Sequence, residues 1–272
     1  MIIDVKQTCA ELKNEFEIMY DGKLVYRASL PFIKISGLFD AEKLREIKVF
    51  DLNNNLKFKS TYNYISNKAE EFIPYKYLVT NSQKFNQYKF VDNQDNVKFE
   101  IYYEQVEIGL GSQVIKMDNK FYNCYGVRDG YISHLSIYDE DLQVGELLKP
   151  NVVIDGKDNY RIYLKKEYSY LADSLAVLAL YLDRIAYNSS YIANESQTVT
   201  YEKSYSKANK FYDKDWVLNN FDSKTYFENV EKEAQMVKKN VKEYSKKLLT
   251  IMGIAWGVII ILVVILLIIF LR

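Results

Sequence analysis

The residues best suited to chemistry in this chain are its single histidine and its two cysteines. His134 lies in the alternating segment YISHLSIY, Cys124 precedes it, and Cys9 stands near the N-terminus. A cysteine beside a histidine can act as an activated nucleophile, so Cys124 and His134 would form such a pair if their strands were neighbours. A metal site would need further ligands at a suitable spacing. We predict ordinary packing or surface roles for both residues, with no catalytic and no metal site.

Two further motifs have an ordinary structural explanation. Gly109 and Gly111 flank one leucine, but the helix and the Lys-Ser/Thr pair of a phosphate-binding loop do not follow them. Asp139, Glu140 and Asp141 cluster where a turn is expected, and a calcium loop would need more regular ligands. We therefore expect no cofactor and no enzymatic activity.

The composition excludes some function classes and favours strands. Lys+Arg and Asp+Glu both total 36, so no excess positive charge favours nucleic acid as a partner. The 25 tyrosines and 14 phenylalanines, against 3 prolines and 10 glycines, suit a strand-rich fold and not a disordered chain. Two cysteines do not make a disulfide framework, which favours a reducing compartment.

Six consecutive β-hairpins are predicted between about residue 14 and residue 166. Turn residues separate alternating apolar runs at Asp21–Gly22, Asn53–Asn55, Asp92–Asn96, Asp118–Asn119, Asp139–Asp141 and Asp155–Gly156. About twelve antiparallel strands must close into a barrel or stack as a sandwich, because open edges invite aggregation. A short helix is expected at Asp40–Arg45. A barrel of this size has an interior too wide for its own side chains, so something must fill it.

The segment SLAVLALYLDRIAY, residues 174–187, is the candidate filling. Apolar side chains occur in every direction around this predicted helix, which we place at 170–187. Its uncharged stretch is far shorter than a bilayer span. The alternative is a re-entrant membrane hairpin with the C-terminal tail, which the polar residues between them disfavour. The predicted barrel-core residues are Leu175, Leu178, Leu182 and Ile185.

Two stretches resemble the tubby C-terminal-like superfamily, which includes the LURP-one-related proteins and the phospholipid scramblases. FEIMYDGKLVYRASL is similar to the opening hairpin of that superfamily, and SLAVLALYLDRIAY is similar to its closing helix. The resemblance covers about residues 10–187 and implies a twelve-stranded barrel threaded by a hydrophobic helix. Tubby domains bind phosphoinositide headgroups, but no residue of that site can be matched here. Scramblases have a cysteine-rich segment before the barrel, where this chain has only Cys9.

The C-terminal segment is predicted to be a transmembrane anchor. Residues 248–271 form 24 consecutive positions without a charge, and a spanning helix needs about 20 apolar residues. The first residues lack the pattern of a signal peptide. Basic residues crowd the N-terminal side of the anchor, against Arg272 alone beyond it, so the positive-inside rule places the main domain in the cytoplasm. The predicted anchor residues are Leu248, Leu249, Trp256, Ile260, Phe270 and Leu271. The predicted juxtamembrane basic residues are Lys238, Lys239, Lys242, Lys246 and Lys247. A role in setting the membrane orientation of the chain explains these lysines fully. The alternative is that they attract anionic lipid.

Between the barrel and the anchor we predict a polar linker, 188–224, and an amphipathic stalk helix, 225–247. Apolar residues recur at alternating spacings of three and four in the stalk, as they do in coiled coils. They are Phe227, Val230, Ala234, Val237, Val241, Tyr244 and Leu248. Two interpretations stay open: the stalk self-associates, or it is a single helix whose apolar stripe lies on the domain or on the membrane.

These features predict a domain order of barrel (1–187), linker (188–224), stalk (225–247) and anchor (248–271). The expected function is non-enzymatic: a membrane-tethered, tubby-like module that binds lipid headgroups or a protein partner at the cytoplasmic face. The expected partners are membrane lipids, a protein partner or a second copy through 225–247, and not nucleic acid. The alternative is a scramblase-like protein that transports lipid.

Overall fold

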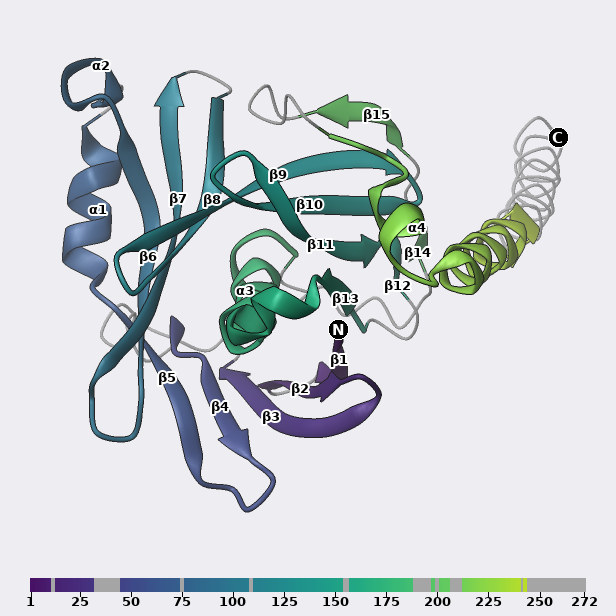
Figure 1. Ribbon diagram of the computed structural model, residues 1–272, viewed down its shortest axis with the longest axis horizontal. Helices are drawn as coiled ribbons and strands as arrows, with labels where there is room; N and C mark the ends of the chain where they lie inside the picture. The colour runs from purple at the N-terminus through teal and green to yellow at the C-terminus, as the bar shows by residue number, and fades with distance from the viewer. Residues whose placement is uncertain are drawn as a thin grey trace, which may run out of the picture.

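Antiparallel strands dominate the computed structural model (Figure 1). The structure describes residues 1–10, 13–31, 45–73, 76–107, 110–153, 157–187, 197–198, 201–205, 212–240 and 242–243. The predicted anchor 248–271, Lys246, Lys247 and most of the predicted helix at 40–45 lie outside these ranges. In the described part of the chain, no helix has both the length and the apolar character needed to cross a membrane.

Within the described residues, twelve strands close into one antiparallel barrel. They are β1 (Ile2–Ala10), β2 (Lys13–Tyr20), β3 (Lys23–Pro31), β4 (Lys48–Asp51), β5 (Leu56–Tyr62), β6 (Gln83–Val91), β7 (Val97–Glu107), β8 (Leu110–Met117), β9 (Lys120–Gly130), β10 (Ile132–Asp139), β11 (Leu142–Pro150) and β13 (Asn159–Leu164). The order β10-β11-β13-β1 and then β2 to β9 returns to its start, because β9 also pairs with β10. The predicted mainly-β, twelve-stranded closed barrel is confirmed.

Five of the six predicted hairpins are confirmed. The connections of four of them contain Asp21, Asn54, Asp95 and Glu140, all with positive φ, and Asp118 and Asn119 turn the β8–β9 hairpin in the same way. Asn, Asp and Gly tolerate this left-handed conformation better than other residues, which is why the sequence signals such turns.

The sixth predicted hairpin is wrong. Its first strand, β12 (Val152–Val153), pairs with β14 (Gln197–Thr198), and β13 pairs with β11 and β1 instead. The twelfth barrel strand is therefore β1, which joins the beginning of the domain to its end. Arg161 on β13 donates to both carboxylate oxygens of Asp4 on β1, at 2.6 and 3.0 Å, and so bridges the closing pair of strands.

The interior of the barrel is filled by helix α3 (Ala172–Leu182), as Figure 1 shows at the centre of the strands. A 3₁₀ segment, η4 (Lys166–Leu171), leads into it, and a π turn, η5 (Asp183–Tyr187), follows it. Every residue of 174–182 is buried, so the helix has no solvent face. Leu175, Leu178 and Leu182 belong to the main core cluster, and the partly buried Ile185 packs against it.

Elements outside the barrel were not foreseen. Helices α1 (Tyr64–Phe72) and α2 (Tyr77–Thr80) connect β5 to β6. In the segment expected to be a linker, β14, β15 (Tyr201–Tyr205) and α4 (Trp216–Asn220) contact the barrel or its β12 extension, with β15 paired to β9. Trp216 and Val217 are buried against the barrel, and their apolar side chains explain why this polar segment attaches there.

Residues 224–240 are helical, and Figure 1 shows this helix beginning beside α4 at the end of the barrel and running outward from there. The apolar stripe of this helix is covered by the same chain: Val230 packs with Ile132, and Ala234 and Val237 pack with Val152. For this part of the helix, the structure selects the interpretation in which the stripe lies on the domain. Val241, Tyr244 and Leu248 lie outside the described residues.

Candidate functional site

Cys124 and His134 are not brought together. Their strands β9 and β10 are neighbours, but Cys124 pairs with Ile137 and His134 pairs with Val127. Because side chains alternate along a strand, the two residues face opposite sides of the sheet. Cys124 lies in the barrel core, where burial raises the pKa of its thiol, so the thiol stays protonated. The pair is therefore not arranged as a nucleophile and its base.

His134 belongs to a buried polar cluster on the outer face of the barrel. Its Nδ1 lies 2.5 Å from Oε1 of Glu146, and the Gln143 amide donates to the other oxygen of that carboxylate at 2.9 Å. The Tyr212 ring approaches the imidazole edge-on, with 5.7 Å between ring centroids. His134 and Tyr212 line a pocket of about 290 Å³ beneath the segment that leads to the docked helix. The cluster joins that segment to β10 and β11, and no serine, threonine or cysteine lines the pocket.

The acidic turn after β10 borders a cavity. Glu140 and Asp141 line a cavity of about 300 Å³ together with Glu104 and Gly111. The described residues contain no group of three or more His, Cys, Asp or Glu side chains that could hold a metal ion. Gly109 lies outside the described residues.

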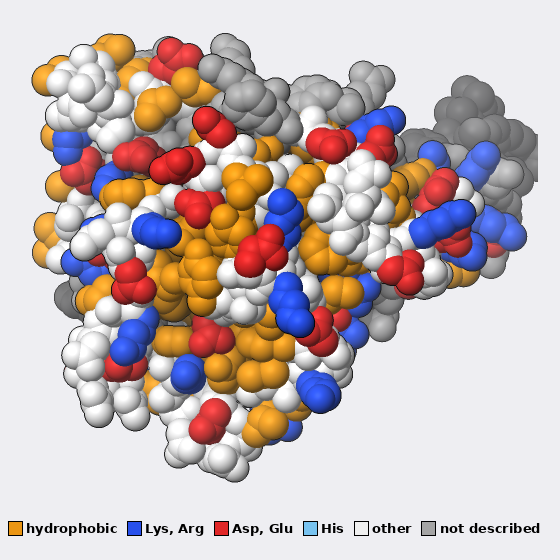
Figure 2. All heavy atoms as spheres, viewed as in Figure 1, with side chains coloured by type: hydrophobic (Ala, Val, Ile, Leu, Met, Phe, Trp, Pro, Cys, Tyr) orange, Lys and Arg blue, Asp and Glu red, His pale blue; other side chains and the backbone are white. Residues whose placement is uncertain are grey.

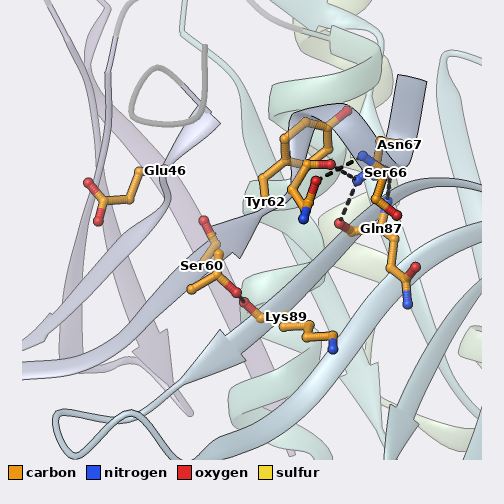
Figure 3. Close-up of a pocket in the computed structure, with 9 residues that line it drawn as sticks. Glu46, Ser60, Tyr62, Ser66, Asn67, Gln87 and Lys89 are labelled. Atoms are coloured by element: carbon orange, nitrogen blue, oxygen red, sulfur yellow. Dashed lines mark hydrogen bonds between the residues drawn. The ribbon is translucent and has the colours of Figure 1, made fainter. Parts of the chain in front are cut away.

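The largest cavity for which the structure gives lining residues, about 580 Å³, lies beside α1 (Figure 3). Its lining is polar and consists of Glu46, Ser60, Thr61, Tyr62, Asn63, Ser66, Asn67, Gln87 and Lys89. Several of these polar groups bond to one another or to the backbone: the Ser60 hydroxyl accepts from the amide of Ile47 at 2.7 Å, and the Asn63 side chain accepts from the amide of Ser66 at 2.8 Å. These bonds cap α1 and join β4 to β5, which is a structural role.

Buried charges stand at the C-terminal end of α3. Burial and the charge of Asp158 raise the pKa of Asp183 to about 7, while a hydrogen bond from Tyr160 opposes this shift. Arg184 donates to the Pro31 carbonyl at 2.6 Å, and its Nε and Nη2 have no hydrogen-bond partner in the part of the chain that the structure describes. Burial lowers the pKa of Arg184. Sequence reasoning placed the helix and the Asp183–Arg184 pair at its end, but it did not foresee that both charged side chains are buried.

The α1–α2 connection attaches to the barrel through polar groups. Asn67 donates to the Asn63 carbonyl at 2.8 Å and accepts from the amide of Gln87 at 2.7 Å. Gln83 donates to the carbonyls of Glu70 and Ile73 at 2.6 and 3.0 Å. The sequence does signal the start of α1, because Asn63 is a favourable N-cap residue, but the sequence analysis missed it.

Part of the predicted basic cluster is described. Lys238, Lys239 and Lys242 are exposed at the end of the docked helix, on the side from which the chain continues toward 248–271. Lys246, Lys247 and all six predicted anchor residues lie outside the described residues, so their roles stay predictions.

Comparisons with known proteins give one likeness. No family model matches the chain, and no curated protein matches it. The solved structure of a protein from Arabidopsis thaliana is similar to this chain at 10% sequence identity and a TM-score of 0.33, over 65% of this chain and 90% of that one. A likeness of this degree identifies neither a family nor an activity.

Proposed function

We propose that this protein is a non-enzymatic, tubby-like binding module held at the cytoplasmic face of a membrane by residues 248–271. The observation that carries the proposal is the docking of helix 224–240 on the barrel, directly before the apolar segment. Val230 packs against the barrel, and Ala234 and Val237 pack against Val152 of the β12 extension, so this helix is part of the domain and not a free stalk.

The docked helix limits how far the barrel can stand from a membrane. Only seven residues separate position 240 from Leu248, which makes eight steps from one residue to the next, and an extended chain advances about 3.5 Å per step. The end of the helix therefore lies within about 28 Å of the predicted anchor, whatever conformation connects them. This distance is an upper limit, and wherever the connection is shorter and brings Lys238, Lys239 and Lys242 to the membrane surface, each lysine contributes about 1 kcal/mol through anionic headgroups.

Binding receives more support than a reaction. The barrel interior is occupied by α3, so substrate has no route through the core. Cys124 faces that core, and His134 is engaged with Glu146 and packed by Tyr212. The proposed ligands are lipid headgroups or a protein partner at the membrane face.

The tether is tested with the full chain by membrane fractionation. Ile260→Arg places a charge near the middle of the predicted span, which costs about 2.5–3.5 kcal/mol, so we expect protein to move into the soluble fraction. Ile260→Leu is the matched control and should fractionate like the wild type. Equal membrane recovery of all three proteins, resistant to alkaline extraction, would contradict an anchor at this segment.

Ligand binding is tested on the anchored full chain in vesicles that contain either anionic or only zwitterionic lipid. Ligand that binds the folded state raises its stability, so we expect a higher Tm with anionic lipid. The triple variant Lys238→Gln, Lys239→Gln, Lys242→Gln should lose much of that difference. An equal Tm in both vesicles would exclude headgroup binding. Flipping of labelled lipid above that of empty vesicles would instead favour the scramblase-like alternative.

A further inference from the structure

The α1–α2 connection contacts the barrel through Asn67 and the tyrosines Tyr64 and Tyr77, and it leaves its large aliphatic residues and Phe72 toward solvent. The only buried residue of α1 is Asn67, and that of α2 is Tyr77. The exposed side chains are large and apolar: Ile65 is 79% exposed, Phe72 83%, Leu78 74% and Val79 86%. Surface helices of soluble domains have the opposite arrangement. Figure 2 shows hydrophobic side chains at the left edge, where Figure 1 places α1 and α2.

The outward position of these apolar residues is fixed by the fold. Asn67 and Gln83 are buried. Asn67 accepts from the backbone amide of Gln87 on β6 at 2.7 Å, and the side-chain amide of Gln83, also on β6, donates to the carbonyls of Glu70 and Ile73 at 2.6 and 3.0 Å. Because these hydrogen bonds hold the polar face on β6, the helices cannot turn their apolar face inward without leaving buried amides unpaired.

The charges around the apolar side chains are paired. Glu70 accepts from Lys76 at 2.6 Å, and Glu71 pairs with Lys68. The pairing neutralises both carboxylates, which would otherwise be repelled by an anionic membrane surface. The connection also uses residues 63–82 to join two neighbouring antiparallel strands, where two to five residues usually suffice.

We propose that Ile65, Phe72, Leu78 and Val79 insert into the same bilayer that holds residues 248–271. The inference rests on the proposed tether, which keeps the barrel within reach of lipid. Exposed fractions of 74–86% mean that each side chain stands clear of its neighbours, which suits insertion into fluid lipid better than a packed protein interface. Figure 1 places these helices and helix 224–240 at opposite ends of the longest axis, so the barrel lies lengthwise along the membrane.

The test uses tryptophan fluorescence of the full chain in vesicles whose lipid chains carry bromine, which quenches tryptophan on contact. Trp256→Phe removes the tryptophan of the predicted anchor, and the buried Trp216 stays as a common background. Phe72→Trp is then added as the probe. The matched control is Leu52→Trp, at a half-exposed position in the β4–β5 turn, which lies at the bottom of Figure 1, far from α2 and from helix 224–240.

We expect brominated vesicles to quench the added emission of Phe72→Trp and to leave that of Leu52→Trp unchanged. Flotation of the protein with the vesicles, measured in the same samples, reports the tether separately. Floating protein with an unquenched Phe72→Trp overturns the insertion and leaves the tether intact. Protein that does not float overturns the tether, and with it the insertion.

Two further measurements test whether something else binds Ile65, Phe72, Leu78 and Val79. Protein anchored in plain vesicles is mixed with empty brominated vesicles, and quenching there would mean contact with a second membrane, which overturns the single-bilayer geometry. Light scattering of the detergent-solubilised chain reports self-association. A dimer that Phe72→Ser with Val79→Ser abolishes, together with an unquenched probe, would assign the patch to a second copy and overturn the proposal. Circular dichroism verifies that each variant stays folded.

Discussion

At the scale of single residues, two aspartates hold the ends of the central helix through tyrosine hydroxyls. Tyr20 donates to Asp173 at 2.7 Å near the start of α3, and Tyr160 donates to Asp183 at 2.9 Å just after its end. Burial raises the pKa of Tyr20, so its hydroxyl keeps the proton that this bond needs. Apolar packing holds the middle of this helix, and these two hydrogen bonds add directional contacts at its two ends.

The buried carboxyl of Asp183 predicts a pH dependence of stability. Burial and the charge of Asp158 raise its pKa from 3.8 to about 7 in the folded protein, against Tyr160, Lys149 and Arg184. Between these two values the folded state binds the proton and the unfolded state does not, so the free energy of unfolding falls as the pH rises. At about 1.4 kcal/mol per pKa unit, the loss between pH 4 and pH 7 is about 4 kcal/mol.

Asp183→Asn should remove this part of the pH dependence, because its amide oxygen can still accept from Tyr160 and carries no charge. Urea unfolding at pH 5 and pH 8 measures the effect, and we expect the variant to gain stability over the wild type mainly at pH 8. Asp141→Asn, at an exposed turn, is the control and should follow the wild type. If the free energy of unfolding of Asp183→Asn changed with pH as much as that of the wild type, Asp183 would not be the group that titrates in the core.

Leu178 tests whether packing of α3 determines the stability of the barrel. It is fully buried among the barrel side chains, so Leu178→Ala should lower the free energy of unfolding by about 2–5 kcal/mol. Leu178→Asp buries an unpaired charge and should prevent stable folding. Leu178→Met nearly conserves the volume and should cost less than about 1.5 kcal/mol. Thermal melting of all three is the measurement, and unchanged melting of Leu178→Asp would mean that α3 does not fill the barrel.

At the scale of elements, the sequence predicted local turns and the central helix, but it did not predict which distant strands pair. The hairpin turns contain residues that accept positive φ, such as Asp21 and Asn54, and the run around Leu178 is apolar in every direction. β1 was missed because no turn links it to β13, its partner at the far end of the domain. The sixth hairpin failed for a related reason: Val152 pairs with Thr198, which the sequence gives no means to foresee.

The candidate surfaces were harder to predict than the strands. The spacing of Val230, Ala234 and Val237 correctly indicated a helix with one apolar stripe, but a stripe does not specify what covers it. In α1 the usual polarity is reversed, and Ile65 and Phe72 lie on the solvent side. A search for apolar residues at helical spacing overlooks such a helix, because its buried residue is Asn67.

Ala234 tests the docking of helix 224–240. It is fully buried in a small contact with Val152 and Val237, so Ala234→Leu should overpack this contact and weaken docking by about 1–3 kcal/mol. Hydrogen exchange of the amides of 224–240 should then become faster, while exchange in the barrel strands stays slow. Gln235→Leu adds a similar side chain at the neighbouring exposed position and should leave exchange unchanged. Equal exchange in both variants would contradict the docking.

At the scale of the whole molecule, the barrel, its filling and the docked helix form one packed unit within the described residues. β1 and β13 close the sheet, α3 completes the core, and α4 with helix 224–240 covers the outer face of β10, β11 and β13. We therefore expect the stability to come from the described domain, with the proposed attachment to the membrane as the role of 248–271.

Deleting 248–272 should consequently give a folded, strand-rich protein that is recovered in solution. The main core cluster of the described residues runs from Ile3 to Leu182 and packs within the barrel, so we expect a cooperative melt with a Tm within a few degrees of that of the full chain in detergent. Size-exclusion chromatography and circular dichroism provide the measurements. The exposed side chains of Phe72 and Val79 favour aggregation of this product, so the same deletion with Phe72→Ser and Val79→Ser serves as the control. Recovery of both deletion products only in membranes or aggregates would show that the C-terminal segment belongs to the fold and is not a separate anchor.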